Sequence, residues 1–115
     1  MSIRDFRVNL SPEEAATMIQ EWVVNGSLSG TLIDHYERQV GESKIIVFIL
    51  EKYYMRSSNR ASLTVTIDNL TDETKVHAVA AGSSEGIMRF DWGAGKNFSQ
   101  SVENALGQHI ISVIE

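Results

Sequence analysis

Apolar and polar residues alternate most regularly in the middle of the chain. In the segment from Ala61 to Asn69 the side chains at positions 61, 63, 65 and 67 are apolar, and serine, threonine and aspartate stand between them. This period of two predicts a strand with one buried face. The run IIVFIL at residues 45–50 is apolar at every position, which is typical of a strand covered on both faces. The segment between them, residues 55–60, is polar, so the pattern predicts a hairpin over residues 44–69.

A strand and a helix precede this hairpin. Residues 6–10 alternate between apolar and polar side chains, which predicts a strand. Ser11 then has the features of a helix N-cap, because a proline follows it and Glu14 completes a capping box three residues later. Apolar residues at helical spacing predict a helix that ends at Gly26 and buries one stripe in the core. That stripe consists of Ala15, Met18, Ile19, Trp22 and Val23.

Further strands and a final helix are expected on either side of the hairpin. Residues 29–39 have the mixed polarity of an edge strand or of a strand whose outer face meets water. Leu32, Asp34 and Tyr36 lie on one side, and Ile33, His35 and Glu37 on the other. Residues 74–82 form the last clear strand, with His77 pointing outward, and residues 88–92 a short extended segment. From Phe98 to the C-terminus, helical spacing predicts one long amphipathic helix. Its apolar stripe carries Val102, Ala105, Leu106, His109, Ile110 and Val113.

The predicted order is therefore strand, helix, four strands, helix. Consecutive strands joined by short turns form an antiparallel sheet, and two amphipathic helices bury their stripes on a shared surface. We expect an α+β, two-layer fold in which a sheet of about five strands carries both helices on one face. At 115 residues the chain is a single domain, residues 1–115. The topology resembles the TATA-box-binding-protein-like or helix-grip arrangement, which implies nothing about function.

Composition narrows the functional classes. The chain has no cysteine, which excludes disulfides and thiolate metal sites. Its formal net charge of −5 argues against nucleic-acid binding, because phosphate backbones would be repelled on average. The N-terminus carries charges where a signal peptide needs an apolar run, and no apolar stretch approaches the length of a membrane span. These features predict a cytoplasmic protein that does not contact membranes.

A glycine-rich stretch before the last predicted helix is the first candidate site. Glycines allow close backbone approach to a ligand, and a helix N-terminus favours an anion. The stretch matches neither a Walker loop nor a dinucleotide-binding fingerprint, so a tight turn explains the glycines equally well. The polar hairpin loop adds two arginines that are solvated or contact an anion. The candidate ligand-binding residues are Arg89, Asp91, Trp92, Gly93, Gly95, Lys96, Arg56 and Arg60.

The doubly apolar strand is the second candidate. Two helices on one face of a sheet leave the other side of residues 45–50 uncovered. An uncovered apolar surface indicates an oligomer interface or the floor of a ligand groove. We expect a homodimer formed through the sheet, with Ile46, Phe48 and Leu50 at its interface.

The chain has no recognisable catalytic or cofactor motif. His35, His77 and His109 lie on three different predicted elements and lack the local spacing of a metal site. We expect His109 in the core or at its boundary, and His35 and His77 pointing outward. No metal and no cofactor is predicted. Because no serine, histidine and aspartate constellation or carboxylate pair is visible, the sequence does not favour an enzyme.

Four segments together resemble a family of short proteins from Firmicutes that is known as a domain of unknown function. They are FRVNLSPEEAA, SGTLIDHYER, EKYYMRSSNRASLTVTIDNL and RFDWGAGKNF. The resemblance covers nearly the full length. It implies a bacterial, cytoplasmic, stand-alone domain and no particular activity.

Two functional hypotheses follow from the sequence. The first is a non-enzymatic binding or protein-interaction module that forms homodimers through its sheet. The alternative is a small enzyme, or a protein that binds an anionic or phosphate ligand, using the glycine-rich turn. The partners expected are a second copy of the chain, a small anionic ligand or another protein.

Overall fold

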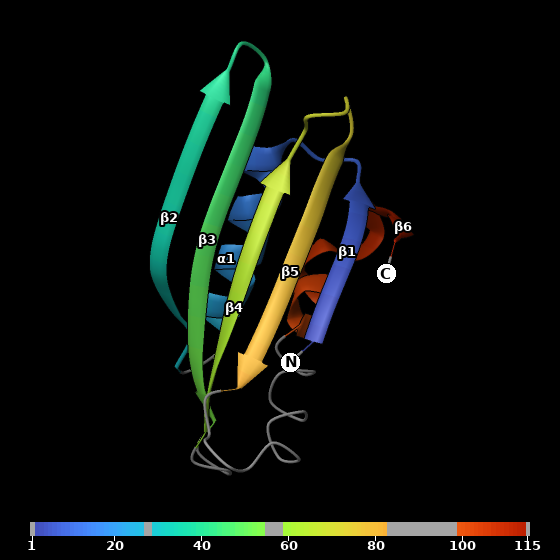
Figure 1. Ribbon diagram of the computed structural model, residues 1–115. Coiled ribbons are helices and arrows are strands. Elements are labelled where there is room, and N and C mark those ends of the chain that lie inside the picture. The colour runs from blue at the N-terminus through green and yellow to red at the C-terminus, as the bar shows by residue number, and fades with distance from the viewer. Residues whose placement is uncertain (1, 27–28, 55–58, 83–98, 115) are drawn as a thin grey trace.

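The computed structural model of the protein describes residues 2–26, 29–54, 59–82 and 99–114. Over these residues the chain forms two helices and a six-stranded antiparallel sheet in the order β2-β3-β4-β5-β1-β6 (Figure 1). The predicted α+β class is confirmed, with one strand more than expected. The elements are β1 Ser2–Val8, α1 Pro12–Gly26, β2 Thr31–Val40, β3 Ser43–Tyr54, β4 Asn59–Asp68, β5 Thr74–Gly82, a helix at residues 99–106, a 3-10 turn at Gly107–His109 and β6 Ile110–Val113.

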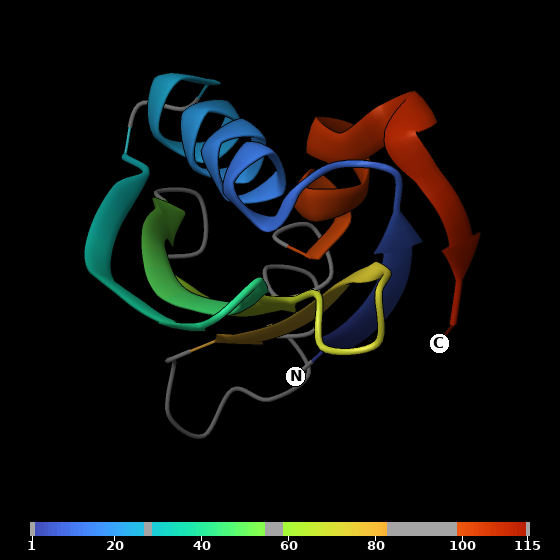
Figure 2. The same ribbon diagram turned by 90° about the horizontal axis from the view of Figure 1, so that it is seen from above.

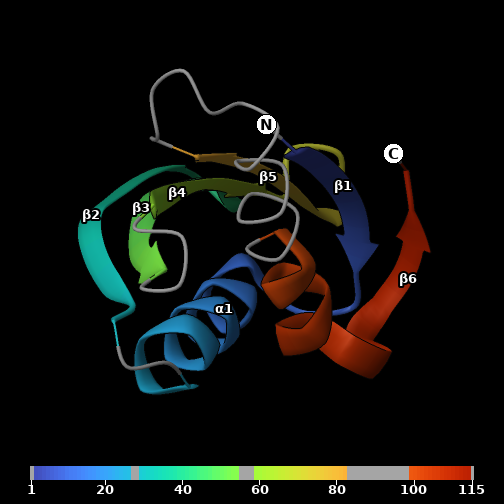
Figure 3. The ribbon, with the colours of Figure 1, turned by 90° about the horizontal axis from the view of Figure 1, so that it is seen from below.

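Both helices lie on the same side of the curved sheet, as Figures 2 and 3 show from above and below. We call the helix-covered side of the sheet the inner face and the opposite side the outer face. The strands bury their inner-face side chains because alternate residues point to opposite sides of a strand. These core side chains are Phe6, Val8, Ile46, Phe48, Leu50, Ala61, Leu63, Val65, Ile67, Val76, Ala78 and Ala80.

The predicted central hairpin is confirmed as β3 and β4. The two strands pair from Ile45 opposite Asp68 to Tyr54 opposite Asn59. This register sets Ile46 opposite Ile67, so the fully apolar strand shares the core with the alternating one. The other side of β3, carrying Ile45 and Val47, is only partly buried on the outer face.

The predicted capping box starts α1. The Ser11 hydroxyl accepts a hydrogen bond from the Glu14 backbone N–H at 3.1 Å, and the Ser11 backbone N–H donates to the Glu14 carboxylate at 3.0 Å. The expected burial of Trp22 is wrong, because this side chain is 50% exposed. The helix instead packs through a row that includes two alanines, whose small size lets the helix axis approach the sheet closely. That row is Pro12, Ala15, Ala16, Ile19 and Val23.

The prediction of a helix that continues to the C-terminus is also wrong, because the helix ends at Leu106. Gly107 has φ of +52°, a left-handed conformation that ends the helix. The chain then forms β6, which pairs antiparallel with β1. Two further backbone hydrogen bonds fix this return, from Asn9 N to His109 O at 2.9 Å and from Ile114 N to Asp5 O at 2.7 Å. Isoleucine and valine favour this extended ending, because β-branched side chains fit strands better than helices.

The edge strand β2 is confirmed, but its faces differ from the predicted alternation. A bulge falls between Leu32 and Asp34, where the pairing shifts from Leu32 opposite Leu50 to Asp34 opposite Ile49. An extra residue in one strand reverses the alternation beyond it. Leu32 therefore shares the inner face with His35 rather than the outer face with Asp34.

Candidate functional site

Most of the sequence-predicted ligand residues lie outside the described part of the chain. This holds for the glycine-rich stretch with Arg89, Asp91, Trp92, Gly93, Gly95 and Lys96, for the extended segment at 88–92, and for Arg56. Arg60 is described at the start of β4, where its side chain is exposed. Its guanidinium forms an ion pair with Glu51 on β3 at 3.5 Å. The contact of Arg60 thus lies across the central hairpin.

The three residues expected at an interface are placed in the core. Ile46, Phe48 and Leu50 are each 0% exposed. They point to the inner face, which α1 and the helix at residues 99–106 cover. Any contact through the uncovered side of β3 would use the alternate set instead, which is Ile45, Val47 and Ile49.

The most exposed element of the sheet is β2. It stands at the end of the strand order (Figure 1). Every one of its ten residues is exposed. On one side it pairs with β3 from Thr31 to Val40. Its other side pairs with no strand of the described chain. Along this edge, the backbone N–H and C=O groups that point away from β3 have no strand partner in the described ranges.

The side chains of β2 fall into two groups. Asp34, Tyr36 and Arg38 lie opposite the partly exposed residues of β3 and belong to the outer face. His35 and Glu37 lie opposite Phe48 and Ile46 and belong to the inner face. The His35 ring stacks on Phe48, with ring centroids 6.1 Å apart and planes 10° apart.

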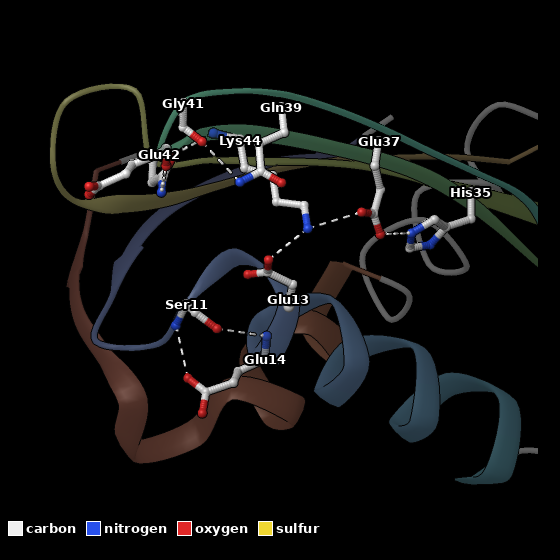
Figure 4. A network of polar contacts seen from close by, with 10 residues as sticks. Ser11, Glu13, Glu14, His35, Glu37, Gln39, Gly41, Glu42 and Lys44 are labelled. Atoms are coloured by element: carbon white, nitrogen blue, oxygen red, sulfur yellow. Dashed lines mark hydrogen bonds and ion pairs between the residues drawn. The ribbon is translucent and has the colours of Figure 1, made fainter.

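The inner-face residues of β2 join a chain of polar contacts that reaches β3 and α1 (Figure 4). The Lys44 ammonium lies 2.6 Å from a Glu13 carboxylate oxygen and 3.1 Å from Glu37. Glu37 in turn lies 2.6 Å from His35 Nε2, and Gln20 Nε2 lies 2.8 Å from His35 Nδ1. The network therefore links α1 to the β2-β3 hairpin.

Both ring nitrogens of His35 have a polar partner, Gln20 Nε2 at Nδ1 and the Glu37 carboxylate at Nε2. A carboxylate only accepts hydrogen bonds, so Nε2 is the nitrogen that donates to Glu37. The sequence did not identify the roles of Gln20, Glu13 and Lys44, because these residues are far apart in the chain and only the packing of α1 brings them together.

Electrostatic coupling follows the same contacts. The hydrogen bond from His35, followed by that from Lys44, lowers the pKa of Glu37 below its ordinary value of 4.5. The hydrogen bond from Lys44 lowers the pKa of Glu13, and Glu13 and then Glu37 raise the pKa of Lys44 above 10.5. The Lys44 side chain is 13% exposed, so its ammonium is held between the two elements. The arrangement stabilises charge and fastens the edge strand to the helix.

A second polar group lies at the opposite end of the strand order. His77 on β5 pairs with Asp5 on β1, and these two residues are directly opposed across the strands. Nearby, Arg7 donates to Ser112 at 2.9 Å and to Glu73 at 3.3 Å. These residues border an open cavity of about 380 Å³ that Lys75 also lines. Glu73 offsets part of the positive charge there.

The three histidines do not converge. His35 is on the inner rim of β2, His77 on the outer face of β5, and His109 in the 3-10 turn with its ring 3.0 Å from the Asn9 side chain. Thus His77 points outward as expected and His35 does not. Among the described residues, no group of three or more histidine, aspartate or glutamate side chains could hold a metal ion.

No helix in the described ranges is long and apolar enough to cross a membrane.

Comparison with known proteins gives a family and no activity. No curated protein and no solved structure matches the chain. A family model described as a family of unknown function (DUF6054) matches residues 1–110. The match spans nearly the whole sequence, and the chain therefore belongs to this family of unknown function.

Proposed function

We propose that the protein is a non-enzymatic interaction module that associates with a second copy of itself through the exposed edge of its sheet. The observation that carries the proposal is β2, a ten-residue edge strand with every residue exposed. Natural sheets usually keep edge strands short or cover them, because a free edge is a template for another strand. A long uncovered edge therefore favours a role in pairing.

The polar network supports this role by holding β2 in place. Contacts from Lys44 and Gln20 tie Glu37 and His35 to the rest of the fold. At the start of the strand, the Ser29 hydroxyl donates to the Tyr53 carbonyl at 2.8 Å, and the Tyr53 N–H donates to the same hydroxyl at 3.2 Å. A strand that is already ordered loses less conformational entropy when a partner binds.

The outer face beside β2 supplies apolar surface. Tyr36 is 52% exposed and lies opposite Val47, which is flanked on β3 by Ile45 and Ile49. In edge pairing Tyr36 meets the second copy, whereas the partly exposed stripe on β3 lies one strand away from the contact and stays in water. A chain without cysteine also suits a reducing compartment, and a cytoplasmic location is part of the proposal.

The alternative of an anion site at Lys96 stays a prediction, because that stretch lies outside the described residues. No observation among the described residues favours it over pairing through β2.

Sedimentation equilibrium over roughly 1 to 100 μM protein tests the proposal. We expect a reversible monomer–dimer equilibrium. Hydrogen exchange measured across the same concentrations should show added protection of amides in β2. The short edge strand β6 is the internal control, whose exchange should not change with concentration. A monomer at every concentration would refute the proposal.

A further inference from the structure

The polar side chains of β2 form complementary pairs around Tyr36. In the segment Asp34-His35-Tyr36-Glu37-Arg38, an acidic residue and a basic residue stand two positions on either side of Tyr36. A histidine and a glutamate stand one position on either side. The segment follows the bulge, so its alternation is regular from Asp34 to Arg38.

We infer that two copies of the chain pair antiparallel through β2, in the register that sets Tyr36 opposite the Tyr36 of the second copy. The inference rests on the proposed function and specifies its contact. Residues directly opposed in an antiparallel pair share a face of the sheet. Asp34 would then oppose Arg38 of the second copy on the outer face, and His35 would oppose Glu37 on the inner face.

Two-fold symmetry limits the alternatives. In a symmetric antiparallel pair the axis passes midway between the two copies of one residue, which therefore oppose each other. Centring the pair on Asp34, Glu37 or Arg38 would place like charges directly opposite each other, which is destabilising. The register centred on Tyr36 opposes unlike charges on the outer face, and each such pair occurs twice in a symmetric dimer.

The outer-face charges are available for this pairing. Asp34 and Arg38 are exposed, and among the described residues neither forms an ion pair. Arg38 Nη1 donates to the Tyr36 hydroxyl at 3.2 Å, which keeps the guanidinium over the centre of the strand. Asp34 accepts a hydrogen bond from the His35 backbone N–H at 2.9 Å, which orients its carboxylate.

A protective role for these charges is the competing explanation. Edge strands often carry charges that prevent association. Charges of one sign repel a second copy in every register, whereas this strand carries both signs, and Asp34 meets Arg38 when the strand is reversed. Complementary charges select a partner and a register, so the pattern favours a second copy of the chain.

Charge reversal at the two outer-face positions tests the register. In the homodimer of Asp34→Arg, an arginine at position 34 opposes Arg38 of the second copy in both pairs. In the homodimer of Arg38→Asp, both pairs oppose two aspartates. Each variant should weaken the dimer by roughly 10- to 100-fold in Kd. An equimolar mixture of the two variants should form a heterodimer, because every opposed pair is then unlike. The double variant Asp34→Arg/Arg38→Asp should again form a homodimer.

Lys75→Asp is the matched control for Arg38→Asp. It makes the same charge change on β5, the fourth strand in the order, where Lys75 lies opposite Arg7. This control should dimerise as the wild type does. Circular dichroism verifies that each variant is folded, and sedimentation with one variant carrying a mass tag distinguishes heterodimer from homodimer.

The outcomes separate the two proposals. A wild-type protein that remains monomeric refutes self-association and with it the register. A wild-type dimer whose single variants dimerise unchanged, or whose mixture stays monomeric, refutes the register and leaves self-association standing. Weak single variants with a restored mixture and a restored double variant support the register.

Discussion

Lys44 links three elements of the fold, because it stands on β3 and contacts both α1 and β2. Its ammonium contacts carboxylates on α1 and β2 from its own position on β3. Neither carboxylate is near Lys44 in sequence. The two carboxylates favour the charged form of Lys44, and the ammonium in turn favours the ionised form of both carboxylates.

The first prediction concerns acid stability. Glu13 and Glu37 have lowered pKa values in the folded protein, so their contribution to stability is present above pH 4.5 and is lost as the pH falls through the lowered values. Lys44→Met removes the main cause of the shift at Glu13 and one cause at Glu37. The variant should therefore lose less stability on acidification than the wild type does.

Urea denaturation from about pH 3 to pH 7 measures this difference. Lys75→Met, which removes a lysine on the outer face, serves as the control and should retain the wild-type dependence. An acid limb in Lys44→Met that matches the wild type would contradict the electrostatic role of the network.

The second prediction concerns the start of α1. Ser11→Ala removes the hydroxyl that accepts the Glu14 N–H, which should lower the free energy of unfolding by about 1 kcal/mol. Thr17→Ala, at an exposed position within the helix, is the control and should not destabilise, because alanine favours a helix. Chemical denaturation compares the two. Equal losses would show that the cap contributes nothing specific.

At the scale of elements, the sequence predicts those features that depend on residues close together in the chain. The capping box at Ser11 and the alternation from Ala61 onward depend on neighbours in the chain, and both are confirmed. The end of the last helix is different. Apolar spacing continues past Leu106 as if the helix did, but Gly107 and the free edge of β1 give the chain a more favourable extended ending.

The third prediction tests that ending. A Cβ at Gly107 would meet no atom within 4 Å, so Gly107→Ala introduces no clash. Its cost is the left-handed backbone, about 1 to 2 kcal/mol for a residue with a side chain. Gly26→Ala at the end of α1 is the control, since Gly26 has open space and no positive φ. Thermal unfolding should show a loss for Gly107→Ala alone, and equal stability of both variants would contradict the assignment.

The candidate site was less accessible to sequence reasoning than the fold. The alternation of β3 defines two sets of apolar side chains but does not say which set the helices cover. The register with β4 decides it, because Phe48 lies opposite Val65, which belongs to the buried set of its own strand. The complementary residues around Tyr36 are visible in the sequence. They predict a contact only once β2 is known to stand at the sheet edge.

At the scale of the whole molecule, the two edges of the sheet are unequal. β2 runs for ten residues, and β6 at the other edge runs for four. Association through β2 would extend the sheet and keep the helices of both copies on one side of it. The outer faces would then join into one surface, with the stripe around Val47 adjacent to the two-fold axis on each side.

The last prediction distinguishes this edge association from packing of one outer face against another. Val47 points out of the sheet plane on the strand next to β2, at the centre of the partly exposed apolar stripe. Val47→Lys adds a charge there without touching the backbone groups of the edge. If two copies pair through β2, the Kd of the variant should stay within about threefold of the wild type, because the added ammonium remains in water. If the copies pack face to face, the lysine is desolvated against the second apolar stripe and the dimer is lost. Sedimentation equilibrium of Val47→Lys separates the two geometries, since edge pairing leaves the dimer of this variant intact and face packing abolishes it. Asp34→Arg, measured beside it, should weaken the edge-paired dimer.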